Sequence, residues 1–425
     1  MYKILIAEQI PALNKGEEAI LEGILESLKI IGESKFYMLS AYPEIDAPRY
    51  GSKIKIIDIK DVFVFKLFVK NKLIRFFLSA IVIFKHLLFL VAYRIFKLGA
   101  LRFTRSDIWR VYIESDLIIQ GHDGSFDYGG PIIFYQFFLP FFAKMLNKPI
   151  VLYAGKITSS RVFNKAIKFA LKRFDLITLR ETISYKNAEK LGFNENIYVT
   201  ADLAFLLQPA SQDRITEIMI KEGLDKLPRP FIGMTVRRKM ADVKSLRSNG
   251  YEVNYNKHIE MLSKVIDNLV DQLKCTIIFI PHCIGPGKNL DDRIVSEDVF
   301  KVCRNKENIR VVIKEYNSSE LKGLIGKLDL LIGERLHSVI NAIAMNVPSL
   351  AISFSSDQRL EMIRMIAQED YICYIENLDA DTLLNRINNI WLDRDRIKSK
   401  LEVDVKIMKE RAMLNGKLVK QLLER

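Results

Sequence analysis

Short apolar runs rich in β-branched residues alternate along the chain with stretches whose apolar residues recur every three or four positions. The short runs predict strands and the periodic stretches predict helices. Seven strands are predicted first, at residues 3–7, 36–39, 54–57, 117–119, 150–153, 176–179 and 197–200. Five more follow at 231–236, 276–280, 310–313, 328–332 and 349–352. Strands that are apolar on both faces and separated by helices are typical of parallel sheets covered on both sides.

A polar stretch with prolines, residues 207–230, separates the two series of strands. We interpret it as the connection between two domains. The expected architecture is α/β, with two doubly wound Rossmann-like domains at 1–206 and 231–392 facing each other across a cleft, and a C-terminal helix at 393–425. Ligands of such sheets bind at the carboxyl ends of the strands, so side chains that directly follow strands are the candidates for a site.

Composition excludes several classes of protein. The chain has 425 residues, of which 49% are hydrophobic and 27% charged, which are ordinary values for a globular protein. The four cysteines form no C-x-x-C pair, which is typical of a reducing cytosol, and the N-terminus lacks the shape of a cleavable signal. The five histidines are scattered and G-x-G-x-x-G is absent, so neither a bound metal nor a nicotinamide cofactor is expected.

The formal net charge of +13 is concentrated in one apolar segment. Residues 62–102 contain eight basic residues and no acidic one, and the longest uncharged run, 76–84, is too short to span a bilayer. The segment, in a helical insertion at about 61–105, is therefore expected to lie on an anionic membrane surface. The alternative is a buried helix whose long basic side chains extend to solvent. Nucleic-acid binding is not expected, because the basic residues interleave with apolar ones.

Basic side chains follow several predicted strands. Arg335 and His337 come after the strand at 328–332, at the start of a helix. An arginine offers a planar fork for a carboxylate or phosphate, and a histidine can exchange a proton near neutral pH. Three more basic residues follow other strands: Arg180, Arg237 and His282. Each could instead be structural, as in an ion pair between Arg180 and its neighbour Glu181.

Polar residues and glycines follow three strands of the first series. The glycine-dense run QGHDGSFDYGGP comes after the strand at 117–119, and glycines let the backbone approach a ligand closely. A glycine-bearing turn also opens the helix after the first strand, which predicts either an anion site or a capped helix start. The candidates from these stretches and from the end of the strand at 197–200 are Asn14, Gly16, Glu17, His122, Asp127 and Asp202.

Taken in order, these segments resemble the polysaccharide pyruvyl transferase family over most of the chain. The resemblance is carried by NKGEEA near the N-terminus, the glycine loop at 120–130, LRETISYKNAEKLGF with the later Asp202, GMTVRR, IPH with the later Asp291 and Asp292, and GERLHSVINAIAMNVP. It implies a two-domain fold similar to the B-type glycosyltransferases. It also implies transfer of pyruvate from phosphoenolpyruvate, as co-substrate, to two sugar hydroxyls of a cell-surface glycan precursor, forming a cyclic ketal.

The resemblance suggests roles for the candidates. Arg335 and His337 would be catalytic, and the donor would be bound by Arg335, Arg237, Arg180 and His282. The remaining candidates would face the saccharide acceptor, which could be lipid-linked, or line the cleft. The enzyme would be cytoplasmic and peripheral at the inner face of the plasma membrane. Two alternatives stay open: a nucleotide-sugar-dependent glycosyltransferase of the same architecture, and a non-catalytic partner in a glycan assembly complex.

Overall fold

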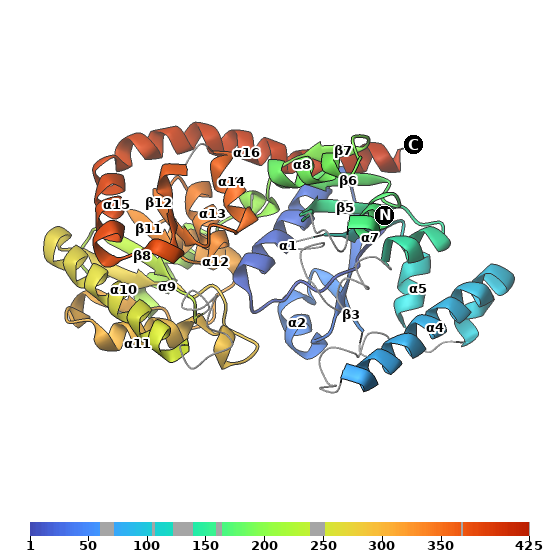
Figure 1. Cartoon of the computed structure of the whole chain (residues 1–425), viewed down its shortest axis with the longest axis horizontal. Helices are drawn as coiled ribbons and strands as arrows, with labels where there is room; N and C mark the ends of the chain where they lie inside the picture. The colour runs from blue at the N-terminus through green and yellow to red at the C-terminus, as the bar shows by residue number, and fades with distance from the viewer. Residues whose placement is uncertain are drawn as a thin grey trace. The chain divides into compact units, whose positions relative to one another are not determined.

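The computed structural model describes residues 1–59, 72–103, 107–121, 139–158, 164–238, 251–366 and 369–424. The chain forms two compact units, whose elements are labelled in Figure 1. Unit 1 comprises Met1–Ala12, Ser27–Thr200 and Leu414–Arg425, and unit 2 comprises Leu13–Glu26 and Ala201–Met413. Helix α1, Lys15–Leu28, and helix α16, Arg394–Leu423, therefore each begin in unit 2 and end in unit 1.

Unit 1 is built on a seven-stranded parallel sheet in the order β3-β2-β1-β4-β5-β6-β7. The strands are β1 Tyr2–Ile6, β2 Ser34–Ser40, β3 Ile54–Asp58, β4 Leu117–Gln120, β5 Ile150–Gly155, β6 Leu176–Leu179 and β7 Ile197–Val199. Its helices include α2 Pro43–Tyr50, α4 Lys72–Phe96, α5 Asp107–Glu114, α7 Asn164–Leu171 and α8 Thr182–Lys190. Leu5, Ile118 and Leu152 on neighbouring strands are fully buried in the core between sheet and helices.

Unit 2 is built on a six-stranded parallel sheet in the order β10-β9-β8-β11-β12-β13. The strands are β8 Phe231–Thr235, β9 Thr276–Phe279, β10 Ile309–Val311, β11 Leu330–Gly333, β12 Ser349–Ser353 and β13 Ile372–Tyr374. Its helices include α9 Gln212–Lys221, α10 Tyr251–Leu273, α11 Asp292–Val302, α12 Ser318–Ile325, α13 Leu336–Ala344, α14 Glu361–Arg364 and α15 Ala380–Leu392. In both units the first strand is central and the strand order reverses beside it, which is the doubly wound topology expected from the sequence.

Local sequence explains where the elements begin. Helix α12 starts with a capping box, in which the Asn317 side chain accepts the N–H of Glu320 at 2.9 Å and the Glu320 carboxylate accepts the N–H of Asn317 at 2.8 Å. All twelve predicted strands are present. The structure adds a short strand, β13, that was not among the predicted ones.

The expected domain boundaries can be compared with the two units. The range 1–206 differs from unit 1 because residues 13–26 belong to unit 2, and the expected connection at 207–230 contains helix α9. The expected C-terminal helix at 393–425 corresponds to α16. All four cysteines are free and buried. Within the described ranges, every helix is too short or too polar to cross a membrane.

Candidate active site

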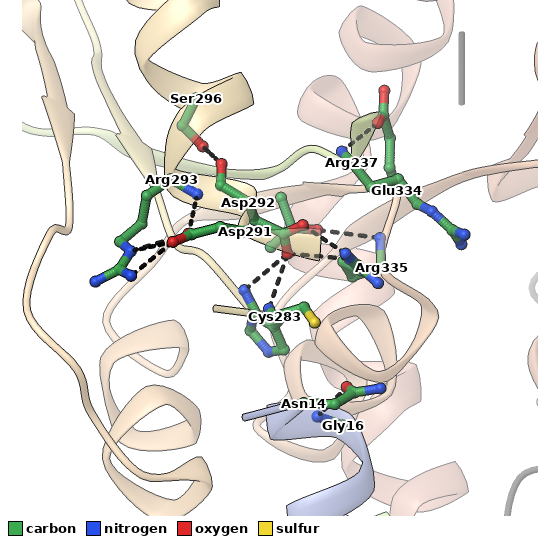
Figure 2. A network of polar contacts seen from close by, with 12 residues as sticks. Asn14, Gly16, Arg237, Cys283, Asp291, Asp292, Arg293, Ser296, Glu334 and Arg335 are labelled. Carbon is green, nitrogen blue, oxygen red and sulfur yellow. Dashed lines mark hydrogen bonds and ion pairs between the residues drawn. The ribbon is translucent and has the colours of Figure 1, made fainter. Parts of the chain in front are cut away.

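The candidate site lies in unit 2, where the strands β8, β9 and β11 end. The strand order reverses beside β8, and this is the position where ligands bind in doubly wound sheets. Arg237 follows β8, His282 follows β9, and Glu334 and Arg335 follow β11. The backbone N–H of Arg237 donates to a Glu334 carboxylate oxygen at 2.8 Å, which joins the ends of β8 and β11 (Figure 2). Three of the expected donor-binding residues are therefore brought together.

Arg335 is held by Asp292 in a two-pronged ion pair (Figure 2). Its Nη2 lies 2.5 Å from Asp292 Oδ1 and its Nε lies 3.0 Å from Oδ2. The same Oδ2 accepts the backbone N–H groups of His282 at 3.1 Å and Cys283 at 2.9 Å. Burial lowers the pKa of Arg335, but the Asp292 charge and its hydrogen bonds outweigh this and raise the pKa. The guanidinium is thus fixed and permanently charged.

Within the described ranges, the Arg237 guanidinium has no carboxylate of its own, although the more distant charges of Glu334 and Asp292 favour its charged form. Burial, together with repulsion from Arg335 and Arg359, lowers its pKa to about 10. Arg359 is itself neutralised by Asp357, with Nε 2.9 Å from Oδ1 and Nη2 2.8 Å from Oδ2. Among the described residues, none offers a hydrogen-bond acceptor to Arg237 Nε. Three guanidinium groups therefore influence one another here, and one of them keeps an excess positive charge.

His282 is fully buried and electrically neutral. Burial is the main reason why its pKa falls to about 4, and the nearby cations Arg335 and Lys15 lower it further. Its Nδ1 lies 3.1 Å from the Ile280 carbonyl oxygen. A neutral ring in this position donates Nδ1–H to the carbonyl and leaves a lone pair on Nε2, which no described residue contacts by a hydrogen bond. His282 thus supplies a hydrogen-bond acceptor, not a positive charge.

The N-terminus of α1 is attached to the loop after β9. The Lys15 N–H donates to the His282 carbonyl oxygen at 2.7 Å, and the Ile284 N–H donates to the Leu13 carbonyl oxygen at 3.0 Å. Asn14 Oδ1 accepts the Gly16 N–H at 3.2 Å and so caps the turn (Figure 2). This explains why residues 13–26 belong to unit 2 although they follow the first strand of unit 1. The expected pair Asn14 and Gly16 therefore lies beside His282.

His337 in the first turn of α13 packs directly on Gly16. A Cβ atom at position 16 would lie 2.5 Å from His337 Nδ1 and 2.7 Å from its Cβ and Cγ, so only glycine fits there. His337 Nε2 lies 3.8 Å from Asp202 Oδ2. Asp202 is buried, and its Oδ1 accepts the Ala204 N–H at 2.9 Å. The contact is too long for a hydrogen bond but places the Asp202 carboxylate next to the imidazole ring.

Acidic residues of α1 and a buried lysine complete this end of the site. Glu17 is buried in the first turn of the helix. Lys15 Nζ lies 3.1 Å from Glu18 Oε2 and 3.3 Å from Glu315 Oε1. Burial raises the pKa of Glu18 in spite of Lys15. The lysine charge is therefore shared between two carboxylates, unlike the charge of Arg237.

The other expected site residues are Arg180, which belongs to unit 1, and two residues that the structure does not describe. Arg180, at the end of β6 in unit 1, is buried with its Nε 3.3 Å from Glu181 Oε2. Glu181 in turn accepts the Ser184 hydroxyl at 2.5 Å, so Arg180 has the ion pair that was its structural alternative. His122 and Asp127 lie outside the described residues.

Sequence reasoning gave too little weight to the residues that hold the arginines. Asp292 reads as a solvated helix start, and only the fold shows it buried under Arg335. The Glu334 Oε1 atom also lies 2.7 Å from Nε2 of His258, a residue of α10. Burial lowers the pKa of His258, but the Glu334 charge and hydrogen bond outweigh this and raise it. Arg359 and its partner Asp357 follow β12 without a recognisable motif.

No metal site is indicated in the described part of the chain. There, no group of three or more His, Cys, Asp and Glu side chains could hold a metal ion. The acidic doublet after β9 illustrates this: Asp291 caps α11 by accepting the Arg293 N–H at 3.0 Å, while Asp292 binds Arg335. Both carboxylates are therefore engaged with arginines.

Solved structures with a similar fold include an epimerase and a glycosyltransferase. UDP-GlcNAc 2-epimerase from Neisseria meningitidis has a TM-score of 0.61 at 10% identity, with all of both chains covered. HepE from Anabaena in complex with UDP has a TM-score of 0.57 at 10% identity, again over all of both chains. A glycosyltransferase from Rickettsia africae has a TM-score of 0.56 at 14% identity, over 100% of this chain and 99% of that one. At these identities the likeness shows the fold alone, and the expected B-type glycosyltransferase architecture is confirmed.

Sequence comparison points to one transferase family. The amylovoran biosynthesis protein AmsJ of Erwinia amylovora is 24% identical over 316 residues, which cover 73% of this chain and 72% of that protein. The sequence profile of the family described as polysaccharide pyruvyl transferase matches residues 14–356, more than half of the chain. This range includes all the residues placed above at the ends of β8, β9 and β11. The chain therefore belongs to the polysaccharide pyruvyl transferase family.

Proposed function

We propose that this protein transfers pyruvate from phosphoenolpyruvate to two hydroxyls of a saccharide, forming a cyclic ketal during the synthesis of a cell-surface polysaccharide. Family membership supports the reaction class, and the similarity to AmsJ, named for amylovoran biosynthesis, supports the pathway class. Because phosphoenolpyruvate is a metabolite of the cytoplasm, the reaction would take place there. The acceptor would be a saccharide precursor, which could be lipid-linked.

The observation that carries the proposal is the uncompensated charge of Arg237. Arg335 and Arg359 each have their own carboxylate, whereas the half-buried Arg237 beside them forms no such ion pair with any described residue. Phosphoenolpyruvate brings a carboxylate and a phosphate, and binding these anions would relieve the repulsion among the three guanidinium groups. In this proposal Arg237 and Arg335 bind the donor, and Arg180, already paired with Glu181, has a bracing role in unit 1.

The chemistry requires two proton transfers. The methylene carbon of the donor gains a proton, C2 forms two bonds to acceptor oxygens, and the bond from C2 to the phosphate oxygen breaks. The two hydroxyl protons balance the new methyl group and the departing phosphate. In this proposal His337, whose Nε2 lies 3.8 Å from Asp202 Oδ2, gives a proton, and the Nε2 lone pair of His282 accepts a hydroxyl hydrogen bond. No metal or organic cofactor is required for these steps.

The acceptor is proposed to bind beside the start of α1. Asn14 and Gly16 lie next to His282 and His337 through the contacts described above, and Glu17 follows them in the first turn of α1. Asn14 and Glu17 carry the side-chain oxygens that commonly bind sugar hydroxyls. Gly16 keeps the backbone close to His337, so a bound hydroxyl would lie near the proton-transfer groups.

The test separates donor binding from chemistry. We expect phosphoenolpyruvate to raise the melting temperature of the full-length protein, and R237M to lose that rise. We expect H337Q to show the same rise in melting temperature with phosphoenolpyruvate. Its rate of phosphate release should fall at least a hundredfold, because an acid or base typically contributes that much to the rate. Phosphate release would be measured with phosphoenolpyruvate and a panel of nitrophenyl hexosides with free 4- and 6-hydroxyls.

Two results would reject the proposal. A melting shift with UDP-glucose and none with phosphoenolpyruvate would favour the glycosyltransferase alternative. UDP-glucose is the informative competitor because solved structures of HepE and of the epimerase are named with UDP-glucose and UDP-GlcNAc. No shift with either compound would favour the non-catalytic partner. K327Q, at an exposed lysine of unit 2 that donates to Gln212, serves as a control for loss of one positive charge.

A further inference from the structure

Helix α4 of unit 1 carries a continuous row of exposed apolar side chains. Six members of the row are 47 to 69% exposed: Phe77, Ile81, Phe84, Leu88, Val91 and Ile95. They are separated by alternating steps of four and three residues, which places all of them on one side of a helix. Monomeric soluble proteins rarely expose an apolar surface of this extent unless something binds to it.

The opposite side of α4 is fixed on the core of unit 1. His86 and Phe89 are buried with their ring centroids 4.6 and 4.3 Å from the ring of Trp109 in α5, and Leu90 is buried beside them. Trp109 in turn lies 4.4 Å from the ring of Phe142. Figure 1 shows α4 and α5 close together, as these ring contacts require. The helix is therefore attached through one face, and its exposed row serves no packing purpose within the described part of unit 1.

The charges around the row indicate what covers it. Lys85 and Arg94 are exposed and, from helical geometry, project about a quarter turn to either side of the row. Residues 62–102 contain no acidic side chain. A second copy of α4 would therefore bring like charges together along the seam, whereas paired helices normally have opposite charges there. An anionic lipid surface accepts both the apolar row and its basic borders.

We propose that α4 lies flat in an anionic membrane surface, with the row of apolar side chains among the acyl chains and Lys85 and Arg94 at the level of the headgroups. The helix does not cross the bilayer, in keeping with its failure to qualify as a span. The buried-helix alternative drawn from the sequence does not fit the exposure of the row. This inference is independent of the proposed reaction, because it uses no residue of the candidate active site.

Vesicle binding by the full-length protein tests the proposal. We expect cosedimentation with vesicles of phosphatidylcholine and phosphatidylglycerol at 7:3, and at least tenfold weaker binding to phosphatidylcholine alone. F84S/L88S should weaken binding at least tenfold and leave its salt dependence in place. K85Q/R94Q should weaken binding about tenfold or more at low salt, because each basic residue near an anionic surface contributes about fivefold, and should flatten the salt dependence.

Matched controls come from α16, which has exposed apolar residues at the same spacing. V403S/I407S removes two exposed apolar side chains four residues apart, and K398Q/K406Q removes two exposed charges. These variants should bind vesicles like the wild type. Equal loss in the controls, or no binding by the wild type to the anionic vesicles, would overturn the proposal. If the wild type does not bind the vesicles and F84S/L88S converts a dimer to a monomer, then the membrane proposal is wrong and the row is an interface between two copies.

Discussion

Replacing Arg237 by methionine should stabilise unit 2 while it abolishes donor binding. Methionine keeps an unbranched apolar stem of similar length but removes the charge that lacks a compensating carboxylate. The folded-state pKa of Arg237, about 10, lies below its ordinary value of 12.5. At pH 7 the arginine is charged in both states, so the folded state holds this charge at a cost, and removal of the charge relieves that cost.

The size of the effect follows from the lowered pKa. A difference from 12.5 to about 10 corresponds to about 3 kcal/mol of unfavourable charging in the folded state. The side chain is partly exposed, so solvent screening and lost contacts of the stem reduce the gain. We therefore expect R237M to raise the free energy of unfolding by about 1 to 2 kcal/mol.

The assay is urea unfolding followed by the fluorescence of Trp391 in α15. The chain has two tryptophans, so a W109F background leaves Trp391 as the only tryptophan and limits the signal to unit 2. R335M is the matched comparison, because it leaves Asp292 buried without its partner and should destabilise by about 3 to 5 kcal/mol. If R237M also destabilises by more than 1 kcal/mol, then Arg237 is a structural residue and the donor-binding argument fails.

Three further predictions test the site. G16A should destabilise unit 2 by about 1 to 3 kcal/mol and lower phosphate release at least tenfold, because its Cβ would overlap His337; G99A, whose Cβ meets ordinary contacts, should change neither. Because the folded-state pKa of His282 is about 4, the free energy of unfolding of the wild type should fall by about 2 to 3 kcal/mol between pH 6.5 and 4.5. Urea unfolding should show no such fall for H282Q. The pH dependence from His258 runs the other way, because its raised pKa gives stability below pH 6.5 that is lost as the pH rises. H258Q should therefore lower the free energy of unfolding more at pH 5.5 than at pH 8.

The sequence by itself determined the framework of the protein. The alternation of β-branched apolar runs with helical periodicity located all twelve predicted strands, because a buried parallel strand must be apolar on both faces. The same pattern indicated that side chains after strands form the site, and Arg237, His282 and Arg335 do follow neighbouring strands of one sheet. The basic, acid-free composition of residues 62–102 likewise marked α4 as unusual.

Only the tertiary structure decided which charges are compensated. The carboxylate that neutralises Arg335 comes from Asp292, 43 residues earlier in the chain, and no local pattern encodes that pairing. The same holds for Gly16, whose need to be glycine arises from contact with His337 in a helix more than 300 residues away. Burial also makes His282, expected only as a donor-binding residue, a neutral hydrogen-bond acceptor. Periodicity is a local property that sequence displays directly, whereas desolvation and charge pairing depend on which distant residues the fold brings into contact.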